Sequence, residues 1–392
     1  MHKLLQTLGT LPSHRVFHLT IGWAVILLII GYVAHLVLPF APTYPYFDAI
    51  LAPLAPAWLA RWGGFDGVHY ITIATQGYVG IGLVQAFFPV YPLLIHMLDV
   101  FHNPLFTGIM ISYLCLVLAA IIFNALPSYL QKGHTQKLDM IRLIALFTFP
   151  TSFFFLGLYT ESLFFLLVVS SWYCAEKKRW GWAALLAGVA SGTRIVGIAL
   201  FPALLFQAYM DHRAAKHHGV PWRAWLTLCV SAIGLIWYMV YLQLTFHDPL
   251  FFMHVQSGFG GGRQDDLILF PQVVYRYIKI LLTARPFDWT YYAYVQELVL
   301  TLEVGVVLAL MTIRKSLRHI PFLIYSWIMY LVPPLTGTFG SMPRYVLVIF
   351  PIYFVFAEFY RKHKGAATLL FVVHAILLVI NILLFIQGKW VA

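Results

Sequence analysis

Charged side chains are scarce in this sequence. Asp, Glu, Lys and Arg make up 10% of the 392 residues, whereas hydrophobic residues make up 61%, and the mean hydropathy is +0.82. This composition excludes a soluble globular protein. Repeated apolar runs approach the roughly 20 residues that an α-helix needs to cross a bilayer. We therefore expect an all-α polytopic membrane protein.

Cysteine is also rare. Cys115, Cys174 and Cys229 each lie within an apolar run, and their spacing fits neither a disulfide framework nor a metal site. The sequence has no internal repeat, no low-complexity tract and no Asn-x-Ser/Thr sequon. The net charge of +11 comes from short basic clusters between the apolar runs, which indicates membrane orientation and not nucleic-acid binding.

Eleven apolar segments are candidates for membrane crossings. They are residues 16–39, 104–126, 139–157, 160–175, 180–193, 195–210, 223–246, 291–313, 320–335, 345–360 and 366–387. The first is too long for the apolar part of a signal peptide and has no small-residue cleavage site, so we interpret it as a membrane anchor. The crossings leave two long outer loops, about 40–103 and 247–290, within a single transmembrane domain, 1–392.

Most of the 25 Lys and Arg residues fall on one side of these crossings. Their clusters are Lys3 with Arg15, Lys132 with Lys137, Lys177–Arg179, Arg213–Arg223, Arg314–Arg318 and Arg361–Lys364. By the positive-inside rule this side, with the N-terminus, is cytoplasmic. Residues 137–177 and 179–213 begin and end with such clusters, so each forms a hairpin, with outer turns near Phe149–Glu161 and Ser191–Arg194. One continuous helix through the second would place Arg194 near mid-bilayer, at a cost of roughly 2.5–3.5 kcal/mol.

The stretch 61–92 follows the first crossing, at a membrane surface, and contains Asp66, His69 and Tyr70. If a helix starts after Phe65, these three residues fall at i, i+3 and i+4 and share one face. A carboxylate, an imidazole and a phenol then converge. This is a suitable place for chemistry on substrates carried by lipids.

Both outer loops contain segments that predict helices. The first has AFFPVYPLLIHMLDVF, which is too short to span easily and which we interpret as an interfacial or re-entrant helix. The second has LILFPQVVYRYIKILLT, an apolar stripe interrupted by polar residues, which predicts an amphipathic helix on the membrane. The glycine run Gly258–Arg263 between the crossings is more typical of a connector than of a phosphate cradle, because no strand precedes it and no Lys-Ser/Thr follows.

The polar residues of five separate loops are all expected on the outer face. They are Asp66, His69, Glu161, Arg194, Arg263, Asp265, Asp266 and Arg344. Carboxylates beside several arginines suit a reaction in which a base deprotonates a hydroxyl while cations hold a phosphate leaving group. A lipid-phosphate donor fits the membrane setting.

Each of these residues also has a structural alternative. Asp66 could be the N-cap of the helix that follows it, and His69 could be a packing residue at the interface. Glu161 could be a first-turn carboxylate that compensates a helix N-terminus behind a threonine cap. Arg194 and Arg344 could be paired within the protein, since an arginine beside long apolar runs is costly without an anionic partner or water. The sequence leaves these alternatives open.

Several motifs resemble a known family. FDGVHYITIATQGY, AFFPVYPLL, LYTESLF, ASGTRIVGI and SMPRYVLVIFPIY, in this order between about residues 60 and 360, are similar to motifs of the GPI mannosyltransferase II family and its prokaryotic relatives. The family resembles the wider GT-C class of membrane glycosyltransferases. The resemblance implies a GT-C-type fold, a first outer loop with a catalytic acid, and a polyprenyl-phosphate sugar as donor. It also implies inversion at the anomeric carbon.

The resemblance implies roles for individual residues. Asp66 matches the acid of the family's Trp-Asp motif and would be the general base, and His69 would position the acceptor or the donor phosphate. Glu161 belongs to the Thr-Glu-Ser motif and joins the catalytic set. Arg194 and Arg344 match the Thr-Arg and Pro-Arg-Tyr motifs. Our own inference, beyond the resemblance, is that Arg194, Arg344, Tyr70, Tyr345 and Arg263 bind substrate. The chain departs from the usual Arg-Trp-Asp form, because Gly63-Gly64-Phe65 separates Trp62 from Asp66, which puts the role of Arg61 in doubt.

The expected function is the transfer of a mannosyl or related hexosyl unit to a hydroxyl of a lipid-linked or membrane-proximal glycan. We expect no metal and no cofactor, apart from the lipid-phosphate sugar as co-substrate. The expected partners are the donor, the acceptor and membrane lipids, and we expect no nucleic acid. A monomer is compatible with the sequence. Compact loops and missing sequons favour a prokaryotic plasma membrane, with the site extracytoplasmic. The alternatives are a transporter or lipid flippase, which usually shows repeats and charges near the bilayer midplane, and an inactive accessory subunit.

Overall fold

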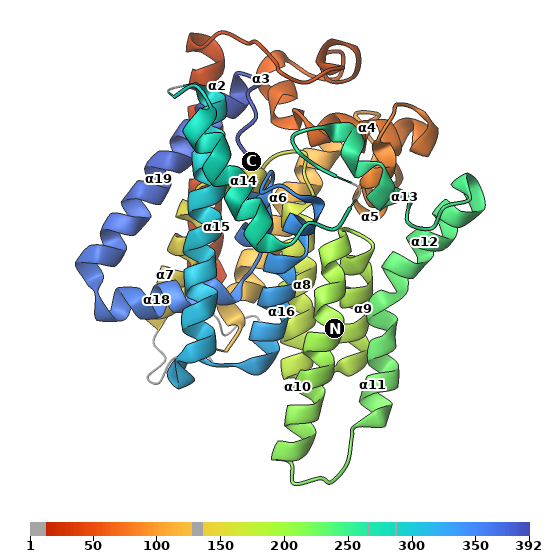
Figure 1. Cartoon of the computed structure of the whole chain (residues 1–392), viewed down its shortest axis with the longest axis vertical. Helices are drawn as coiled ribbons and strands as arrows, with labels where there is room; N and C mark the ends of the chain where they lie inside the picture. Colours follow the sequence, from red (N-terminus) through yellow and green to blue (C-terminus); the bar gives the residue numbers. More distant parts are fainter. Residues whose placement is uncertain (1–12, 128–135, 265, 287) are drawn as a thin grey trace.

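The structure is a computed structural model that describes residues 13–127, 136–264, 266–286 and 288–392. Its regular elements are all helices, and these residues contain no strand (Figure 1). The predicted all-α class is therefore confirmed. Lys3 and Lys132 of the predicted basic clusters, and Asp265 of the predicted outer set, lie outside the described residues.

Six helices of the described chain are long and apolar enough to cross a membrane. They are α2 (Ser13–Val37), α6 (Pro104–Ala125), η6 (Ile195–Ala199) with α10 (Leu200–Ala214), α11 (Trp222–Leu228) through η7 (Cys229–Ala232) to α12 (Ile233–Phe246), α15 (Trp289–Ile313) and α19 (Lys364–Ile386). Each coincides with a predicted crossing. Their length and composition indicate a polytopic membrane protein.

The other five predicted crossings coincide with shorter helices. These are α7 (Gln136–Thr148), α8 (Glu161–Glu176), α9 (Trp180–Ser191), α16 (Ile320–Leu331) and the pair α17 (Met342–Leu347) and α18 (Pro351–Lys362). Two predicted segments, 139–157 and 345–360, are interrupted at Pro150 and Pro351. Proline lacks the N–H that a helix interior requires, so α7 ends before Pro150, and Pro351 begins a new helix in its first turn. The count of eleven crossings stays a prediction.

The two long loops lie at one end of the molecule (Figure 1). Residues 40–103 and 247–290 are at the top of this view, and the turns from α10 to α11 and from α15 to α16 are at the opposite end. An ion pair between Lys178 and Asp211 brings the turn after α8 to the end of α10. The turns that carry Lys177–Arg179, Arg213–Arg223 and Arg314–Arg318 therefore lie away from the long loops. The side of the other basic clusters and the orientation in a membrane stay predictions.

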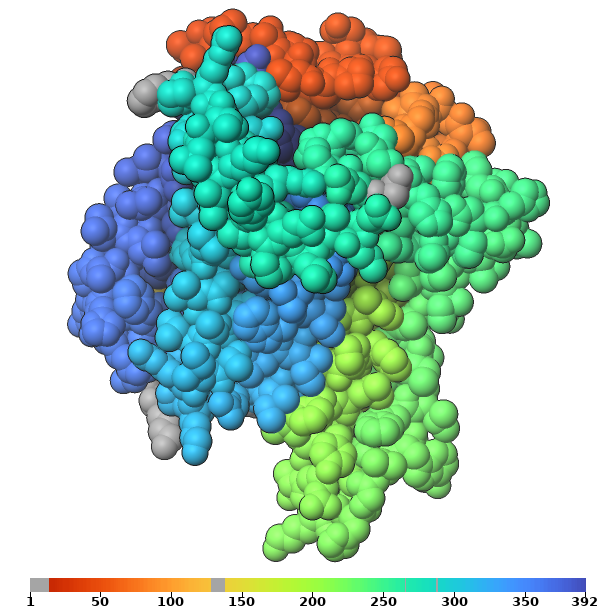
Figure 2. All heavy atoms as spheres, viewed as in Figure 1, coloured from red at the N-terminus to blue at the C-terminus, as the bar shows by residue number. Residues whose placement is uncertain are grey.

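Both loops are helical, as predicted. The first contains α4 (Asp66–Gln76) and α5 (Val90–Leu98), and the second contains α14 (Phe270–Thr283). Shorter elements complete the chain: η1 (Phe47–Leu51), α3 (Ala57–Ala60), η2 (Arg61–Gly63), η3 (Gly77–Val79), η4 (Val84–Ala86), η5 (Ser152–Phe155), α13 (Phe251–His254), η8 (Gln256–Phe259), η9 (Lys315–Leu317) and η10 (Pro333–Thr336). In the space-filling view, residues 247–290 spread over the front, between residues 40–103 above and α16 below (Figure 2).

Helices α9 and α12 approach each other through glycine. A Cβ built on Gly234 would lie 2.2 Å from the carbonyl oxygen of Gly188 and 2.4 Å from the backbone nitrogen of Gly192. Small residues allow this backbone contact, as is common between membrane helices. Ser191 adds a hydrogen bond from Leu235 N to its Oγ, at 3.3 Å. The turn that follows α9 is thereby held in a fixed place, and this turn carries Arg194.

Candidate functional site

A cavity of about 750 Å³ lies among the loops at this end of the molecule. Its walls come from both long loops, from the turn after α9 and from residues 332–345. Seven of the eight predicted site residues line it: Asp66, His69, Tyr70, Arg194, Arg263, Arg344 and Tyr345. The eighth, Glu161, lies behind the wall and is fully buried. A cavity of this size is typical of small-molecule sites.

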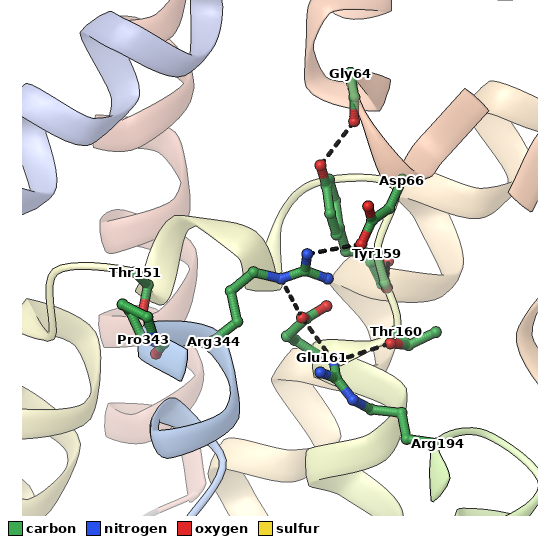
Figure 3. A network of polar contacts seen from close by, with 10 residues as sticks. Gly64, Asp66, Thr151, Tyr159, Thr160, Glu161, Arg194, Pro343 and Arg344 are labelled. Carbon is green, nitrogen blue, oxygen red and sulfur yellow. Dashed lines mark hydrogen bonds and ion pairs between the residues drawn. The ribbon is translucent and has the colours of Figure 1, made fainter. Parts of the chain in front are cut away.

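Four charged residues form a continuous chain of contacts at one side of the cavity (Figure 3). Arg344 donates from Nη1 to Asp66 Oδ2 at 2.7 Å and from Nε to Glu161 Oε1 at 2.8 Å. Arg194 donates from Nη1 to the same Glu161 oxygen at 2.7 Å and to Thr160 Oγ1 at 3.2 Å. With two carboxylates and two guanidinium groups, the chain of contacts is electrically balanced. Buried charges require such pairing.

Asp66 is the first residue of α4, where the helix dipole favours a carboxylate. It is not the N-cap, because Phe65 occupies that position, and no side chain caps the helix. The capping alternative for Asp66 is therefore wrong. Phe65 has φ 56°, a conformation that is uncommon outside glycine, and its ring packs 4.3 Å from that of Tyr44 and 5.2 Å from that of Trp390. This packing fixes the start of α4 and hence the carboxylate.

Glu161 is the first residue of α8 and is 0% exposed. Its Oε1 accepts from both arginines, while Oε2 has no hydrogen-bond partner among the described residues. Thr160 is at the N-cap but its hydroxyl does not cap the helix; it accepts from Arg194 instead. Because Glu161 does not reach the cavity, its geometry suits a residue that positions Arg194 and Arg344.

The two arginines are paired within the protein, as the structural alternative required, and they also face the cavity. Arg194 lies over the Tyr345 ring at 4.6 Å, and Arg344 over the Tyr159 ring at 4.7 Å, which are cation–π distances. Within the part of the chain that is described, no hydrogen-bond acceptor is recorded for Arg344 Nη2 or for Nε and Nη2 of Arg194. These N–H groups remain available to an anion in the cavity.

Asp66 and His69 have perturbed acidities. Burial raises the pKa of Asp66, but the charge and hydrogen bond of Arg344 lower it further, so the net pKa lies below its usual value. Asp66 is therefore ionised at neutral pH. Burial lowers the pKa of His69, and the nearby Asp66 only partly offsets this, so the imidazole is neutral. His69 also stacks on Phe87, with ring centroids 4.6 Å apart, so it is a packing residue as well as a cavity residue.

The cavity wall also contains a buried carboxyl group that the sequence analysis missed. Glu297 of α15 lines the cavity and accepts a hydrogen bond from the hydroxyl of Tyr277, on α14, at 2.5 Å. The same hydroxyl lies 3.1 Å from Thr338 Oγ1. Burial, with the adjacent Glu297, raises the pKa of Tyr277 well above its usual value. An acidic residue inside the apolar run 291–313 was a signal that could have identified Glu297.

Two further expectations concern Arg61 and the glycine run. Arg61 does not line the cavity; its guanidinium lies 4.4 Å from the centre of the Phe40 ring. Gly260 and Gly261 line the cavity with φ angles of 67° and 59°, which suit glycine. Arg263 follows them and donates to Gln256 Oε1 at 3.1 Å. Among the described residues, no three His, Cys, Asp or Glu side chains are grouped in a way that could hold a metal ion.

Comparisons with known proteins give no relative. No family model, curated protein or solved structure matches the chain. The resemblance to the GPI mannosyltransferase II family rests on the sequence motifs alone. Asp66, Glu161, Arg194 and Arg344, which come from four of those motifs, meet in one chain of contacts.

Proposed function

We propose that this protein is an inverting membrane glycosyltransferase of the GT-C type. It moves a mannosyl or related hexosyl unit from a polyprenyl-phosphate sugar to a hydroxyl of a lipid-linked or membrane-proximal glycan. The observation that carries the proposal is the contact between Asp66 and Arg344 at the wall of a loop-lined cavity. A base and a cation that can hold the leaving group then border the same cavity, and group transfer from a phosphate uses both.

The reaction proceeds by a single displacement. The acceptor hydroxyl oxygen attacks the anomeric carbon from the face opposite the phosphate, and its proton passes to the Asp66 carboxylate. The bond between the anomeric carbon and the phosphate oxygen breaks, and the electron pair leaves with the phosphate. Arg344 and Arg194 donate their unpaired N–H groups to the phosphate oxygens, and these charge-assisted bonds strengthen as negative charge develops.

Other cavity residues position the substrates in this proposal. Neutral His69 and Tyr70 lie on the same face of α4 as Asp66 and offer hydrogen bonds to sugar or phosphate oxygens. Tyr345 supports Arg194 from below the guanidinium plane. Arg263 brings a further positive charge from the second loop. Glu161 holds both arginines and does not touch substrate.

The location of the cavity supports a substrate held at a membrane surface. It lies at the end of the molecule that bears the long loops, opposite the basic turns. By the positive-inside rule this end is extracytoplasmic. We therefore propose a monomeric enzyme of a prokaryotic plasma membrane, with its donor's polyprenyl chain in the outer leaflet and its sugar phosphate in the cavity.

The test is an assay of the purified protein in lipid nanodiscs. Polyprenyl-phosphate mannose labelled in the sugar is supplied with a membrane lipid extract as acceptor, and labelled products are separated and their anomeric configuration is determined by NMR. We expect transfer with inversion, abolished in Asp66→Asn and retained in Asp48→Asn, an exposed carboxylate of the same loop. Failure to transfer mannose, glucose or galactose from polyprenyl phosphate would overturn the proposal, and movement of intact donor across vesicles would favour a flippase.

A further inference from the structure

The cavity wall formed by α14 and α15 contains a buried carboxyl group that forms no ion pair within the described chain. Glu297 is 2% exposed and accepts a hydrogen bond from Tyr277. Within the described chain, no Lys, Arg or His nitrogen lies within ion-pair distance of Glu297, in contrast to Asp66 and Glu161. A buried carboxylate needs hydrogen-bond donors to compensate for lost water. Tyr277 and Trp390 both supply side-chain hydrogen bonds to Glu297, and the remaining acceptor capacity is available to a ligand.

Aromatic side chains also line the cavity wall. Trp289 and Tyr294 come from the first turns of α15, and Trp390 comes from the segment after α19. Trp390 also packs against Phe65, with ring centroids 5.2 Å apart, and Phe65 directly precedes Asp66. The aromatic group therefore extends from Glu297 to the start of α4. A ligand held against it would reach toward the Asp66 carboxylate.

Carboxylates and aromatic faces together suit a sugar and not a phosphate. A carboxyl group exchanges hydrogen bonds with several sugar hydroxyls. Aromatic rings pack on the apolar C–H face of a sugar ring. A phosphate, in contrast, is attracted by Arg194 and Arg344. The wall around Glu297 and the wall that carries the arginines thus differ in the chemistry they accept.

We propose that Glu297, Tyr277 and Trp390 form a subsite for the neutral glycan part of the acceptor. It presents the acceptor hydroxyl to Asp66 while the donor phosphate occupies the side with the arginines. This inference rests on the proposed function, and it names the acceptor class as a neutral, hydroxyl-rich glycan. Tyr277 also accepts a hydrogen bond from Phe339 N at 3.1 Å, which ties the subsite to the segment that leads to Arg344.

The first experiment measures binding without catalysis. Saturation-transfer NMR is recorded with mannobiose and the full-length protein in nanodiscs. We expect signals from the mannobiose ring protons with wild type, at least a fivefold loss with Glu297→Gln, and retention with Glu303→Gln. Glu303 lies on the same helix but contacts His374 at 3.1 Å and does not line the cavity. Equal signals from the wild type and Glu297→Gln overturn the subsite whether or not the protein transfers sugar.

The second experiment separates acceptor from donor. In the transfer assay we expect Glu297→Gln to raise the acceptor KM at least tenfold and to change the donor KM less than twofold. Tyr277→Phe keeps the shape of the side chain but removes the bond to Glu297, and should raise the acceptor KM in the same sense. Thermal unfolding checks that both variants fold. An increase in the donor KM alone would assign the subsite to the donor sugar and overturn the proposal. Absence of transfer by the wild type, with mannobiose binding intact, would instead contradict the proposed function.

Discussion

Arg344 donates from Nη1 to Asp66 Oδ2 at 2.7 Å, although 278 positions separate the two residues in the chain. The contact joins the proposed base to a cation of the proposed phosphate site. It also keeps Asp66 ionised, since Arg344 lowers the carboxyl pKa despite burial. One arginine thus influences both the acidity of the base and the binding of the leaving group.

Asp66→Asn tests the base. The amide oxygen of asparagine still accepts from Arg344, so we expect the melting temperature to change little, while single-turnover sugar transfer falls by about 10²–10⁴-fold. Stability and turnover should be measured on one preparation, with Asp48→Asn as the control. An Asn variant that transfers at more than about a tenth of the wild-type rate, below the low end of that range, would show that Asp66 is not the base.

Arg344→Gln tests the coupling between the two residues by pH. In the wild type the lowered pKa of Asp66 keeps the carboxylate charged even at pH values below its ordinary pKa, so the acidic limb of activity lies at a lower pH than an unpaired aspartate would give. Without the arginine, burial raises this pKa. We expect the acidic limb of kcat/KM to move up by about 1–3 pH units, the usual effect of one opposite charge, and kcat to fall. Arg344→Lys should restore part of both. An unmoved limb contradicts the coupling.

Glu161→Gln tests the positioning role. The amide oxygen can still accept hydrogen bonds, but the substitution removes the negative charge that the buried guanidinium groups of Arg194 and Arg344 share. Breaking a buried ion pair in this way costs about 3–5 kcal/mol. We expect a large decrease in thermal stability in detergent, together with reduced transfer. Glu303→Gln is the matched control and should change stability much less. A fully stable, fully active Glu161→Gln protein would contradict the role.

His69→Gln tests the neutral imidazole. Because burial lowers the pKa of His69 in the fold, the unfolded chain binds this proton more readily. Wild-type stability should therefore fall as the pH drops below the ordinary pKa of about 6.5. Removing this titration should make the decrease between pH 7 and pH 5 shallower in the variant. Melting temperatures at half-unit intervals measure the difference, and identical slopes would exclude a shifted His69.

Two single cysteines test the orientation. Val79 is 78% exposed in the first long loop, and Ser316 is exposed in the turn between α15 and α16. In a variant without Cys115, Cys174 and Cys229, we expect Val79→Cys to react with an impermeant thiol reagent on intact cells. Ser316→Cys should react only after the cells are opened. The reverse pattern would place the cavity on the cytoplasmic side.

The local geometry of the site was predictable from sequence spacing. Asp66, His69 and Tyr70 were expected on one helix face, and all three line the cavity. The basic clusters also predicted that distant loops share one end of the molecule, which is why Arg194 and Arg344 were expected near them. Residue spacing indicates which side chains share a helix face, and the basic clusters indicate which loops share a side of the membrane.

Contacts that depend on packing were not predictable. Glu161 was expected at a helix start, and it is there, but nothing in LYTESLF indicates that its carboxylate lies behind the cavity wall. Trp390 reaches the cavity only because the segment after α19 folds back, with Thr43 N donating to Gly388 O at 2.9 Å. Apolar content also predicted continuous helices through Pro150 and Pro351. Hydropathy is averaged over a window of residues, so it does not register that proline lacks the N–H a helix interior requires.

The shared oxygen of Glu161 has a consequence for insertion into the membrane. Arg194 follows Glu161 by 33 positions, so the pair can form as soon as both hairpin legs have left the ribosome. Arg344 can join them only later, because it follows Glu161 by 183 positions. During that interval the acid and its first arginine neutralise each other, which avoids the cost of an isolated charge in lipid. In the newly made chain, Arg194 therefore compensates the charge of Glu161 until Arg344 is translated.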